Sequence, residues 1–294
     1  MPRCTKASKM FSTEKDFSQW TICGLYGSNA LLFENAESTH ALMKSLAHSH
    51  QVEPGAIIVA NSQTKGRGRH ERTWVSPKNK NIYFNLLIPL QGIAQQNYAQ
   101  LTQVAALTFA EVFRSLEPNG TPHPNTKKIT VKWPNDILYE TSKFCGILAE
   151  ILFIPSHSSP IPTLNMGIGI NVNSDASEYE SLGRKVTTLK EIVGTPINRE
   201  MLLNTLVSSF ERALGQFKAF GISPWIEAWR KMDKFIGTRA TVIVNNNCTD
   251  TALANPLASQ KKSGQIIDMQ QDGSLLFRTN DGDTITVYSA DLEI

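Results

Sequence analysis

The sequence predicts an α+β protein: a mixed β-sheet with flanking helices, followed by a small antiparallel β-barrel. Three observations support this prediction. Apolar runs of strand length alternate with helix-like periodic segments as far as residue 236. Beyond that residue the chain carries only short strand patterns, several of them separated by Asp-Gly turns. With 294 residues the chain is also long enough for two domains, since domains usually contain about 100–200 residues.

The first part of the larger region alternates strands with helices. Three apolar runs predict strands, at 30–33, 55–60 and 82–89. Apolar residues at helical spacing predict a helix over 41–47 and a long amphipathic helix over 98–116. A mixed sheet covered by helices is the layered arrangement that this alternation favours.

After a proline- and glycine-rich loop at 117–125, the strand pattern resumes. Further strands are predicted at 129–133, 145–154 and 164–172. The last two are joined by a Ser- and Pro-rich loop and are expected to pair with each other. Two helices, at 198–220 and 224–234, complete the larger region.

The C-terminal region has a different sequence pattern. Short strands are predicted at 240–244, 264–269, 274–278 and 284–288. Asp-Gly pairs at 272–273 and 281–282 favour tight hairpin turns between them. We therefore expect three parts: a flexible N-terminal tail at 1–28, a large domain at 29–236 and the barrel at 237–294.

Composition and charge exclude several classes of protein. Hydrophobic residues make up 41% and charged residues 19% of the chain, which excludes a disordered or collagen-like protein. A net charge of +3 is too balanced to require a nucleic-acid partner. The four cysteines form no Cys-x-x-Cys pair, and no apolar run reaches the about 18–20 residues of a membrane span. We expect a cytoplasmic protein with reduced thiols and neither a nucleic-acid nor a membrane partner.

The segment 63–74 is the most unusual stretch of the sequence. It surrounds Gly66 and Gly68 with basic residues, namely Lys65, Arg67, Arg69 and Arg72. Glycines let backbone N–H groups approach an anion, and arginine forks match phosphate or carboxylate oxygens. This segment is therefore either an anion-binding loop or a solvated basic hairpin.

Two lysines stand near predicted strand ends, together with other polar residues. Lys132 is followed by Trp133 and Pro134, a turn, and then by Asn135 and Asp136. Lys132 can hold a phosphate and Asp136 can hold Mg²⁺, although Asn135 and Asp136 also suit an ordinary turn. Lys143 precedes an apolar strand, where it either meets an anionic ligand or protects a strand edge.

Two further signals are weaker. Ser38 and Thr39 precede the first helix, where a hydroxyl group usually caps the helix and can also contact a polar, urea-like ligand. The segment 167–173 pairs glycines with Asn171, which can reach a sugar or a phosphate. Neither segment defines a ligand alone.

Taken together, these segments resemble the biotin protein ligases, also called holocarboxylase synthetases, in a form that lacks the N-terminal DNA-binding domain. The resemblance covers about residues 30–294 and follows the family's order of motifs. It implies a class II synthetase-like catalytic domain at 29–236 and an SH3-like barrel at 237–294. It further implies that biotin and ATP, with Mg²⁺, form biotinyl-5′-AMP, and that the biotinyl group then passes to a lysine of a biotin carboxyl carrier protein or of the carrier domain of a biotin-dependent carboxylase.

The resemblance also implies roles for individual residues. It makes Lys143, Arg69 and Lys132 catalytic and Asp136 a Mg²⁺ ligand. Ser38, Thr39 and Gln63 resemble contacts of the biotin ureido group, and Trp74 resembles an apolar cover near the nucleotide. The complete implied set of biotin and nucleotide contacts is Ser38, Thr39, Gln63, Gly66, Arg67, Arg69, Arg72, Trp74, Lys132, Asn135, Lys143, Gly146 and Asn171.

Two features depart from the family pattern, and two other functions stay open. His40 stands where the family usually has asparagine, and the pair at 70–71 replaces a more basic or glycine-containing pair. One alternative is another carboxylate-adenylating ligase, such as a lipoate-protein ligase. The other is a non-enzymatic RNA-binding module that uses the basic loop on phosphates and Trp74 as a stacking surface. The sequence leaves the oligomeric state open.

Overall fold

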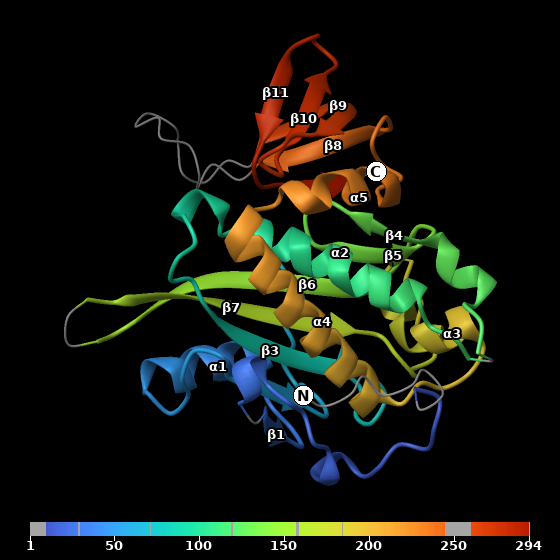
Figure 1. Ribbon diagram of the computed structural model, residues 1–294. Helices are drawn as coiled ribbons and strands as arrows, with labels where there is room; N and C mark the ends of the chain where they lie inside the picture. Colours follow the sequence, from blue (N-terminus) through green and yellow to red (C-terminus); the bar gives the residue numbers. More distant parts are fainter. Residues whose placement is uncertain are drawn as a thin grey trace.

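The computed structural model describes residues 10–28, 30–70, 72–118, 120–156, 159–183, 185–244 and 260–293. The larger sheet is built from β1 (Ala30–Phe33), β2 (Ile57–Ala60), β3 (Ile82–Pro89), β4 (Ile129–Lys132), β5 (Asp136–Tyr139), β6 (Ser142–Ile154) and β7 (Ile161–Ile170). Their order across the sheet is β1-β2-β3-β7-β6-β5-β4 (Figure 1). Only β1 and β2 pair in parallel among these described strands, so the sheet is mixed, as predicted.

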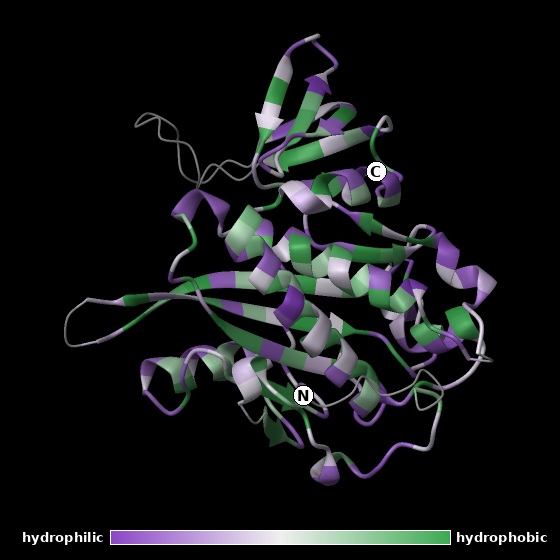
Figure 2. Cartoon of the chain, in the orientation of Figure 1, coloured by the Kyte–Doolittle hydropathy of each residue, from purple (hydrophilic) through white to green (hydrophobic). Residues whose placement is uncertain are grey.

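Helices cover both faces of this sheet. They are α1 (Thr39–His48), α2 (Gln100–Arg114), α3 (Leu189–Val193), α4 (Arg199–Phe220) and α5 (Ser223–Met232). Short 3-10 helices lie at Phe17–Gln19, Leu25–Gly27, Gln95–Asn97, Pro124–Lys128 and Ala176–Leu182. Hydrophobic and hydrophilic residues alternate along α2 and α4, which lie in front of the sheet (Figure 2). Their apolar sides form the main core, where Phe109 contacts the rings of Phe84 and Phe210 at centroid distances of 6.4 and 5.9 Å.

The opposite face of the sheet is only partly covered by a helix. Met43 and Ala47 of α1 pack on Ile58, Leu87 and Leu152 in a second, smaller apolar cluster. Side chains alternate between the two faces along a strand, so Leu87 shares this face with residues two positions away. The part of the face that α1 leaves uncovered is where the functional site lies.

The N-terminal segment is packed against the larger domain. Its apolar side chains at Met10, Phe17, Trp20, Ile22 and Leu25 are buried in the main core. The flexible tail expected at 1–28 is therefore wrong for residues 10–28, while residues 1–9 lie outside the described residues. The sequence does not predict this packing, because the apolar residues of the segment follow neither the strand nor the helix period.

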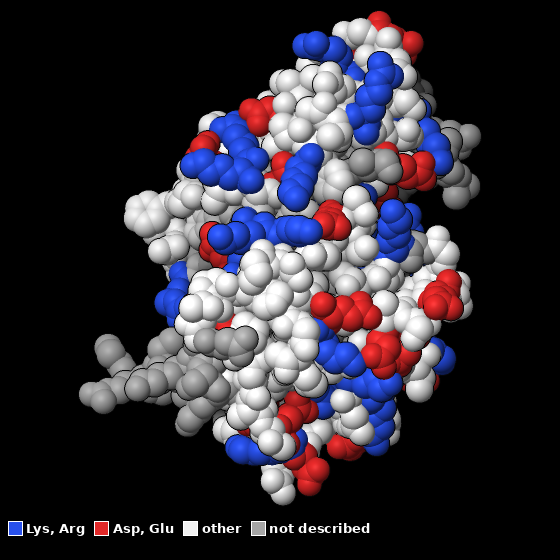
Figure 3. All heavy atoms as spheres, turned by 90° about the vertical axis from the view of Figure 1, so that its right-hand side faces the viewer, with Lys and Arg blue, Asp and Glu red and all other residues white. Residues whose placement is uncertain are grey.

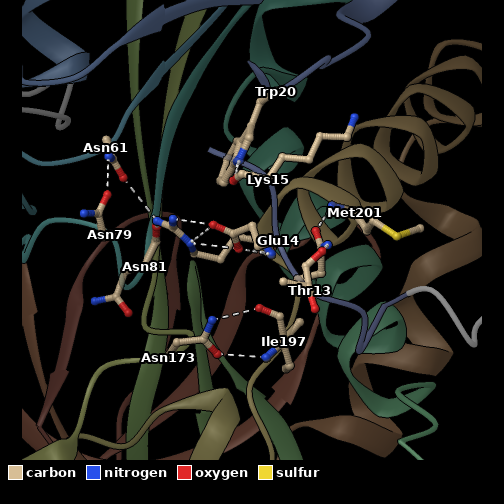
Figure 4. A network of polar contacts seen from close by, with 12 residues as sticks. Thr13, Glu14, Lys15, Trp20, Asn61, Asn79, Asn81, Asn173, Ile197 and Met201 are labelled. Carbon is tan, nitrogen blue, oxygen red and sulfur yellow. Dashed lines mark hydrogen bonds and ion pairs between the residues drawn. The ribbon is translucent and has the colours of Figure 1, made fainter. Parts of the chain in front are cut away.

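An ion pair fastens the same segment to α4 (Figure 4). Glu14 accepts hydrogen bonds from the Arg199 guanidinium at 2.5 and 3.0 Å and from the Arg199 backbone N–H at 2.8 Å. The guanidinium also donates to Oδ1 of Asn61 and to the carbonyl of Asn81, and it lies 5.0 Å from the centre of the Trp20 ring. The Arg199 side chain is only 4% exposed, so its charge depends on this partner.

A separate antiparallel sheet follows at the C-terminus. Its strands are β8 (Arg239–Val244), β9 (Gln260–Met269), β10 (Leu275–Thr279), β11 (Thr284–Val287) and β12 (Asp291–Glu293), in the order β11-β10-β9-β8-β12. The carbonyl of Gly273 joins this sheet to the larger domain by accepting bonds from Gln103 at 2.8 Å and from the Trp133 indole at 2.9 Å. The predicted fold class, a mixed sheet with helices and a small C-terminal β unit, is confirmed.

The surface is of mixed charge on the face that Figure 3 shows. Lysine and arginine side chains lie among aspartate and glutamate side chains there, in agreement with the small net charge. Within the described parts of the chain, we find no helix with the length and apolar character needed to cross a bilayer.

Candidate active site

The floor of the candidate active site is a bare stretch of the larger sheet. Gly146 of β6 pairs with Gly169 of β7, and Gly167 lies two residues along β7 on the same face. The indole of Trp74 rests on this stretch, because a Cβ added at Gly169 would come within 2.5 Å of the ring. Glycine is required here to leave room for the indole.

The basic loop predicted from the sequence forms a short hairpin. Arg67 pairs with Thr73 in an antiparallel bridge, and the Trp74 N–H donates to the Gly66 carbonyl at 2.9 Å. A side chain at Gly66 would collide with the Trp74 carbonyl, so the hairpin needs glycine at this position. The hairpin and the glycine floor line the same cavity.

This cavity gathers most of the residues that the sequence singled out. Its empty volume is about 710 Å³, including the part open to solvent. The predicted residues that line it are Ser38, Thr39, Gln63, Arg67, Arg69, Arg72, Trp74, Asn135, Asp136, Lys143 and Gly146. Gly66, Lys132 and Asn171 do not line it. Segments that are far apart in the sequence thus converge on one hollow.

One part of the cavity is formed by the N-terminus of α1. Ser38 accepts a hydrogen bond from the Ala41 N–H and caps the helix. Thr39 donates from its backbone N–H and from its hydroxyl to Oε1 of Gln63, at 2.8 and 3.0 Å. Ser38 and Thr39 are buried and line the cavity as well, so the capping role and contact with a ligand are compatible.

Lys143 and Asp136 form an ion pair where β5 and β6 lie side by side. Nζ of Lys143 is 2.6 Å from Oδ1 of Asp136 and 5.5 Å from the centre of the Trp74 ring. The two side chains are 23% and 24% exposed. An ammonium group has three N–H donors, so this pair leaves Lys143 able to bind a second anion.

Lys132 and Asn135 are held by neighbouring backbone groups. Nζ of Lys132 donates to the Leu292 carbonyl of β12 at 2.8 Å. Burial lowers the pKa of Lys132 below the usual range of a lysine. Asn135 donates to the Ile147 carbonyl at 2.5 Å, and its Oδ1 accepts a hydrogen bond from Arg69 at 3.2 Å. Asn135 therefore fixes the position of an arginine of the hairpin.

The C-terminal sheet also reaches the cavity, through β12. The carboxylate of Asp291 forms ion pairs with Arg69 at 3.5 Å and with Arg72 at 2.9 Å, and Nε2 of His70 lies 3.3 Å from it. Arg69 donates to the Ala290 carbonyl at 3.2 Å. Asp291 lines the cavity, so the hairpin is tied to the C-terminal sheet at the site itself.

A second, smaller cavity adjoins the first, since Trp74 and Lys143 line both. Its empty volume is about 260 Å³, and Val75, Leu182 and Val186 give it apolar walls. It also contains Asn171, whose Oδ1 is buried without a hydrogen-bond partner among the described residues, as is Nε1 of Trp74. Such orphaned polar atoms are rare in folded proteins and mark places where a ligand can complete the hydrogen bonds.

The described side chains of the site do not form a complete set of metal ligands. In the described ranges, no group of three or more His, Cys, Asp or Glu side chains is placed to hold a metal ion. Asp136, the predicted Mg²⁺ ligand, has one oxygen bonded to Lys143. Magnesium in nucleotide sites is usually held by one or two carboxylates together with phosphate oxygens and water. The donors present fit a Mg²⁺ ion that arrives with a nucleotide.

Several residues that line the cavity were not predicted as ligand contacts: His40, Asn85, Leu148 and Asp291. Asn85 has a local signal, because it is a polar residue inside the apolar run 82–89. Asp291 has none, since its three-residue strand reaches the site only through its pairing with β8 and the packing of the C-terminal sheet.

The fold and the site together define an α+β domain in which Lys143 and the arginines of the hairpin line a hollow of the size of a small molecule. Residues 32–171 match the biotin/lipoate A/B protein ligase family. The biotin–[acetyl-CoA-carboxylase] ligase of Paracoccus denitrificans is 30% identical over 201 residues, which cover 67% of this chain and 78% of that protein. The chain therefore belongs to the biotin/lipoate A/B protein ligase family and is a ligase.

Two further relatives extend the likeness over nearly the whole chain. The bifunctional ligase/repressor BirA of Bacillus subtilis is 27% identical over 290 residues, which cover 98% of this chain and 80% of that protein. The solved structure of a biotin protein ligase from Aquifex aeolicus in complex with biotin and ATP is similar with a TM-score of 0.69 and 25% identity. That match covers 90% of this chain and 97% of the other, so it extends beyond the larger sheet.

Proposed function

We propose that this chain is an ATP-dependent biotin protein ligase, which forms biotinyl-5′-AMP from biotin and ATP and transfers the biotinyl group to a lysine of a biotin carboxyl carrier protein. The observation that carries the proposal is the position of Lys143 and Trp74 where two cavities meet. A carboxylate bound in the larger cavity and a nucleotide bound in the smaller one would meet beside the Lys143 ammonium.

The larger cavity suits biotin. The buried hydroxyl groups of Ser38 and Thr39 and the half-buried amide of Gln63 match a ureido group that carries both N–H donors and a carbonyl acceptor. The glycine floor leaves room for a bicyclic ring, and Lys143 offers a cation to the carboxylate of the side chain. The name of the Aquifex aeolicus complex, which contains biotin and ATP, supports the same pair of ligands.

The smaller cavity suits an adenine ring. Its walls are apolar, and the Trp74 indole offers a flat surface. Oδ1 of Asn171 has no donor among the described residues and can accept a hydrogen bond from the adenine amino group. Asp136, together with phosphate oxygens, would hold Mg²⁺, which supplies neutralising charge to the phosphates when bound. Trp74 and Asn171 would thus orient the nucleotide toward Lys143.

The first reaction step brings two anions together. A carboxylate oxygen of biotin attacks the α-phosphorus of ATP, and the bond from that phosphorus to the bridging oxygen breaks, so pyrophosphate leaves. Lys132, Lys143 and the arginines of the hairpin stabilise the charge that develops, and no enzyme nucleophile takes part. Cys145 fits this account, because it is fully buried and burial raises the pKa of its thiol.

The second step needs retention of the adenylate until a carrier arrives. The amine of the carrier lysine attacks the carbonyl carbon of the adenylate, loses a proton, and AMP leaves. The hairpin that carries Arg67 and Arg69 would cover the reactive anhydride and keep water away from it. We also propose that the catalytic domain ends at 236 and that the barrel occupies 237–294, because α5 ends at Met232 and β8 begins at Arg239. The packed segment 10–28 then belongs to the catalytic domain together with 29–236.

Biotin-dependent exchange of labelled pyrophosphate into ATP tests the proposal. We expect exchange with biotin, little exchange with lipoate or amino acids, and biotin transfer to a carrier domain in the presence of Mg²⁺. Exchange that depends on lipoate instead would assign the chain to the other branch of its family. RNA binding with a steep salt dependence and no exchange at all would support the binding module.

A further inference from the structure

An asparagine in the middle of the sheet faces the larger cavity. Asn85 of β3 lies opposite Gly167 of β7, and Gly167 lies opposite Leu148 of β6, so the three share one face. Gly167 has no side chain, and a Cβ there would lie 3.0 Å from Nδ2 of Asn85 and 3.1 Å from Nδ1 of His40. Asn85 and His40 therefore border the space above Gly167, and both line the cavity.

Hydrogen bonds fix which way the Asn85 amide points. The His40 backbone carbonyl can only accept, and it accepts from Nδ2 of Asn165 at 3.0 Å. Oδ1 of Asn165 must then accept from Nδ2 of Asn85, at 2.7 Å. The amide orientation of Asn85 follows from this chain of bonds, which starts at a backbone atom.

His40 accepts a hydrogen bond from the second N–H of the same Asn85 amide group. Nδ2 of Asn85 lies 3.2 Å from Nδ1 of His40, and Nε2 of His40 lies 3.2 Å from Oε2 of Glu150. Because Nδ2 of Asn85 is a donor, Nδ1 of His40 accepts, and the ring proton lies on Nε2 toward the carboxylate. Burial, which lowers the pKa of His40, favours this neutral ring. Both N–H groups of the Asn85 amide are thus used within the protein.

The Oδ1 atom of Asn85 is left without a partner among the described residues, although the side chain is 0% exposed. A buried acceptor that no donor reaches costs free energy, and proteins keep such atoms mainly at places where a ligand supplies the donor. The acceptor is also held in place on both sides, which is the arrangement that a specificity-determining residue requires.

We propose that Asn85 is a specificity-determining residue of this ligase, whose Oδ1 accepts a hydrogen bond from a ureido N–H of biotin. Asn165 and His40 are positioning residues, because they hold the amide in this orientation. The inference rests on the proposed function, since it takes biotin as the occupant of the larger cavity. It adds a buried acceptor to the hydroxyl and amide groups of Ser38, Thr39 and Gln63.

Calorimetric titration of the full chain with biotin tests this role. Asn85→Leu keeps the volume of the side chain and removes the acceptor, and we expect at least about 10-fold weaker biotin binding. The matched control is Asn173→Leu, since the Asn173 amide bonds to the backbone of Ile197 outside the cavity. Biotin affinity of Asn85→Leu within about twofold of wild type would overturn the inference.

Biotin analogues with a methyl group on one or the other ureido nitrogen make the test specific to the hydrogen bond. Wild type should discriminate strongly against one of the two analogues, and Asn85→Ala should lose most of that discrimination because it removes the acceptor and makes room for the methyl group. Equal discrimination by wild type and Asn85→Ala would overturn the inference. The alanine variant also allows the test if Asn85→Leu does not fold. Wild type that binds no biotin would overturn the proposed function itself.

Discussion

At Lys143, one ammonium group contacts a carboxylate and an aromatic ring within the same site. Its Nζ bonds to Asp136 and faces the Trp74 ring, and the glycine floor lets all three groups approach one another. An added Cβ at Gly146 would lie 2.8 Å from this Nζ, so the glycine is part of the arrangement. The chemistry of the site thus depends on the space left by glycines as well as on charged side chains.

Replacing Lys143 with methionine tests the cation without removing the apolar stem. We expect biotin affinity to fall about 10- to 100-fold, because a hydrogen bond to a charged group contributes about 1.5–3 kcal/mol. Calorimetry measures the affinity, and thermal unfolding reports the effect of leaving Asp136 without its partner. Lys78→Met is the matched control, since Lys78 pairs with Glu34 away from the cavity. Unchanged affinity in the Lys143 variant would remove its assigned role.

Single residues were predictable from the sequence where a motif carries them. The basic hairpin, the segment around Lys132 and Asp136, and Lys143 each have a local pattern, and the fold brings most of these residues to one cavity. Asn85 was missed because a polar residue in a buried strand acquires meaning only when the sheet register gives it neighbours. That register is set by pairing over 80 residues of sequence, as between Asn85 and Asn165.

At the scale of elements, the hairpin is both anchored and exposed. Arg69 is held by Asn135 and by the Ala290 carbonyl, whereas the Arg67 side chain is exposed and has no hydrogen bond or ion pair with any of the described residues. The turn of the hairpin is thus anchored through Arg69, while Arg67, at the paired base of the hairpin, offers a cation to the cavity. This combination suits a cover that orders over a bound adenylate.

Arg69→Gly tests the hairpin as a cover. We expect the adenylate to escape from the variant and to biotinylate an unrelated protein such as serum albumin, because the anchor to Asn135 and Ala290 is lost. Detection with labelled streptavidin measures this off-target labelling. Lys65→Gly is the control, since Lys65 belongs to the same segment and pairs with Glu37 at the surface. Full retention of adenylate by the Arg69 variant would contradict the covering role.

The end of α5 carries a titratable group with a predictable effect on stability. Burial raises the pKa of Asp233 to about 6, although the residue accepts hydrogen bonds from the Trp229 indole and the Phe235 N–H. An acid with a raised pKa binds its proton more tightly when folded. Its contribution to stability is therefore present at low pH and is lost as the pH rises through about 6.

Asp233→Asn should remove this pH dependence. Between pH of about 4 and about 6, wild type should lose stability relative to the variant as the pH rises. The size of the effect is set by about 1.4 kcal/mol per unit of pKa difference. Urea unfolding at several pH values measures it, and parallel curves for the two proteins would show that the Asp233 pKa is not raised on folding.

Elements were predicted well when their own sequence carries the signal. Apolar runs or a helical period predict α1, α2, α4, α5 and the strands of the main sheet other than β5. No pattern in the sequence predicted β5, α3 and β12, which contain four, five and three residues. Elements this short show too few periods to be recognised, and they form because longer neighbours pair with them or pack on them.

At the scale of the whole molecule, both ends of the chain brace the catalytic sheet. The N-terminal segment buries Phe17 and Trp20 in the core, and the C-terminal sheet brings Asp291 to the arginines of the hairpin. Local sequence patterns did not predict either contact, because each joins residues that are more than 180 positions apart, as Glu14 and Arg199 are.

Glu14→Gln tests how much the N-terminal segment contributes to stability. The substitution leaves the buried Arg199 charge without its carboxylate, and we expect a loss of about 3–5 kcal/mol of unfolding free energy. Urea denaturation measures the loss. Lys15→Gln is the matched control, because Lys15 is 58% exposed and an exposed ion pair contributes at most about 1 kcal/mol. Equal effects of both substitutions would show that the segment does not depend on the buried pair.

A crystal structure with a non-hydrolysable biotinyl-adenylate analogue would show whether the two adjoining cavities bind biotin and the nucleotide. We expect the ureido ring above Gly167 within reach of Ser38 and Asn85, the linking group beside Lys143, and the adenine against Trp74 and Asn171. An analogue bound to any other surface, with these residues left without a ligand contact, would show that the two cavities are not the active site.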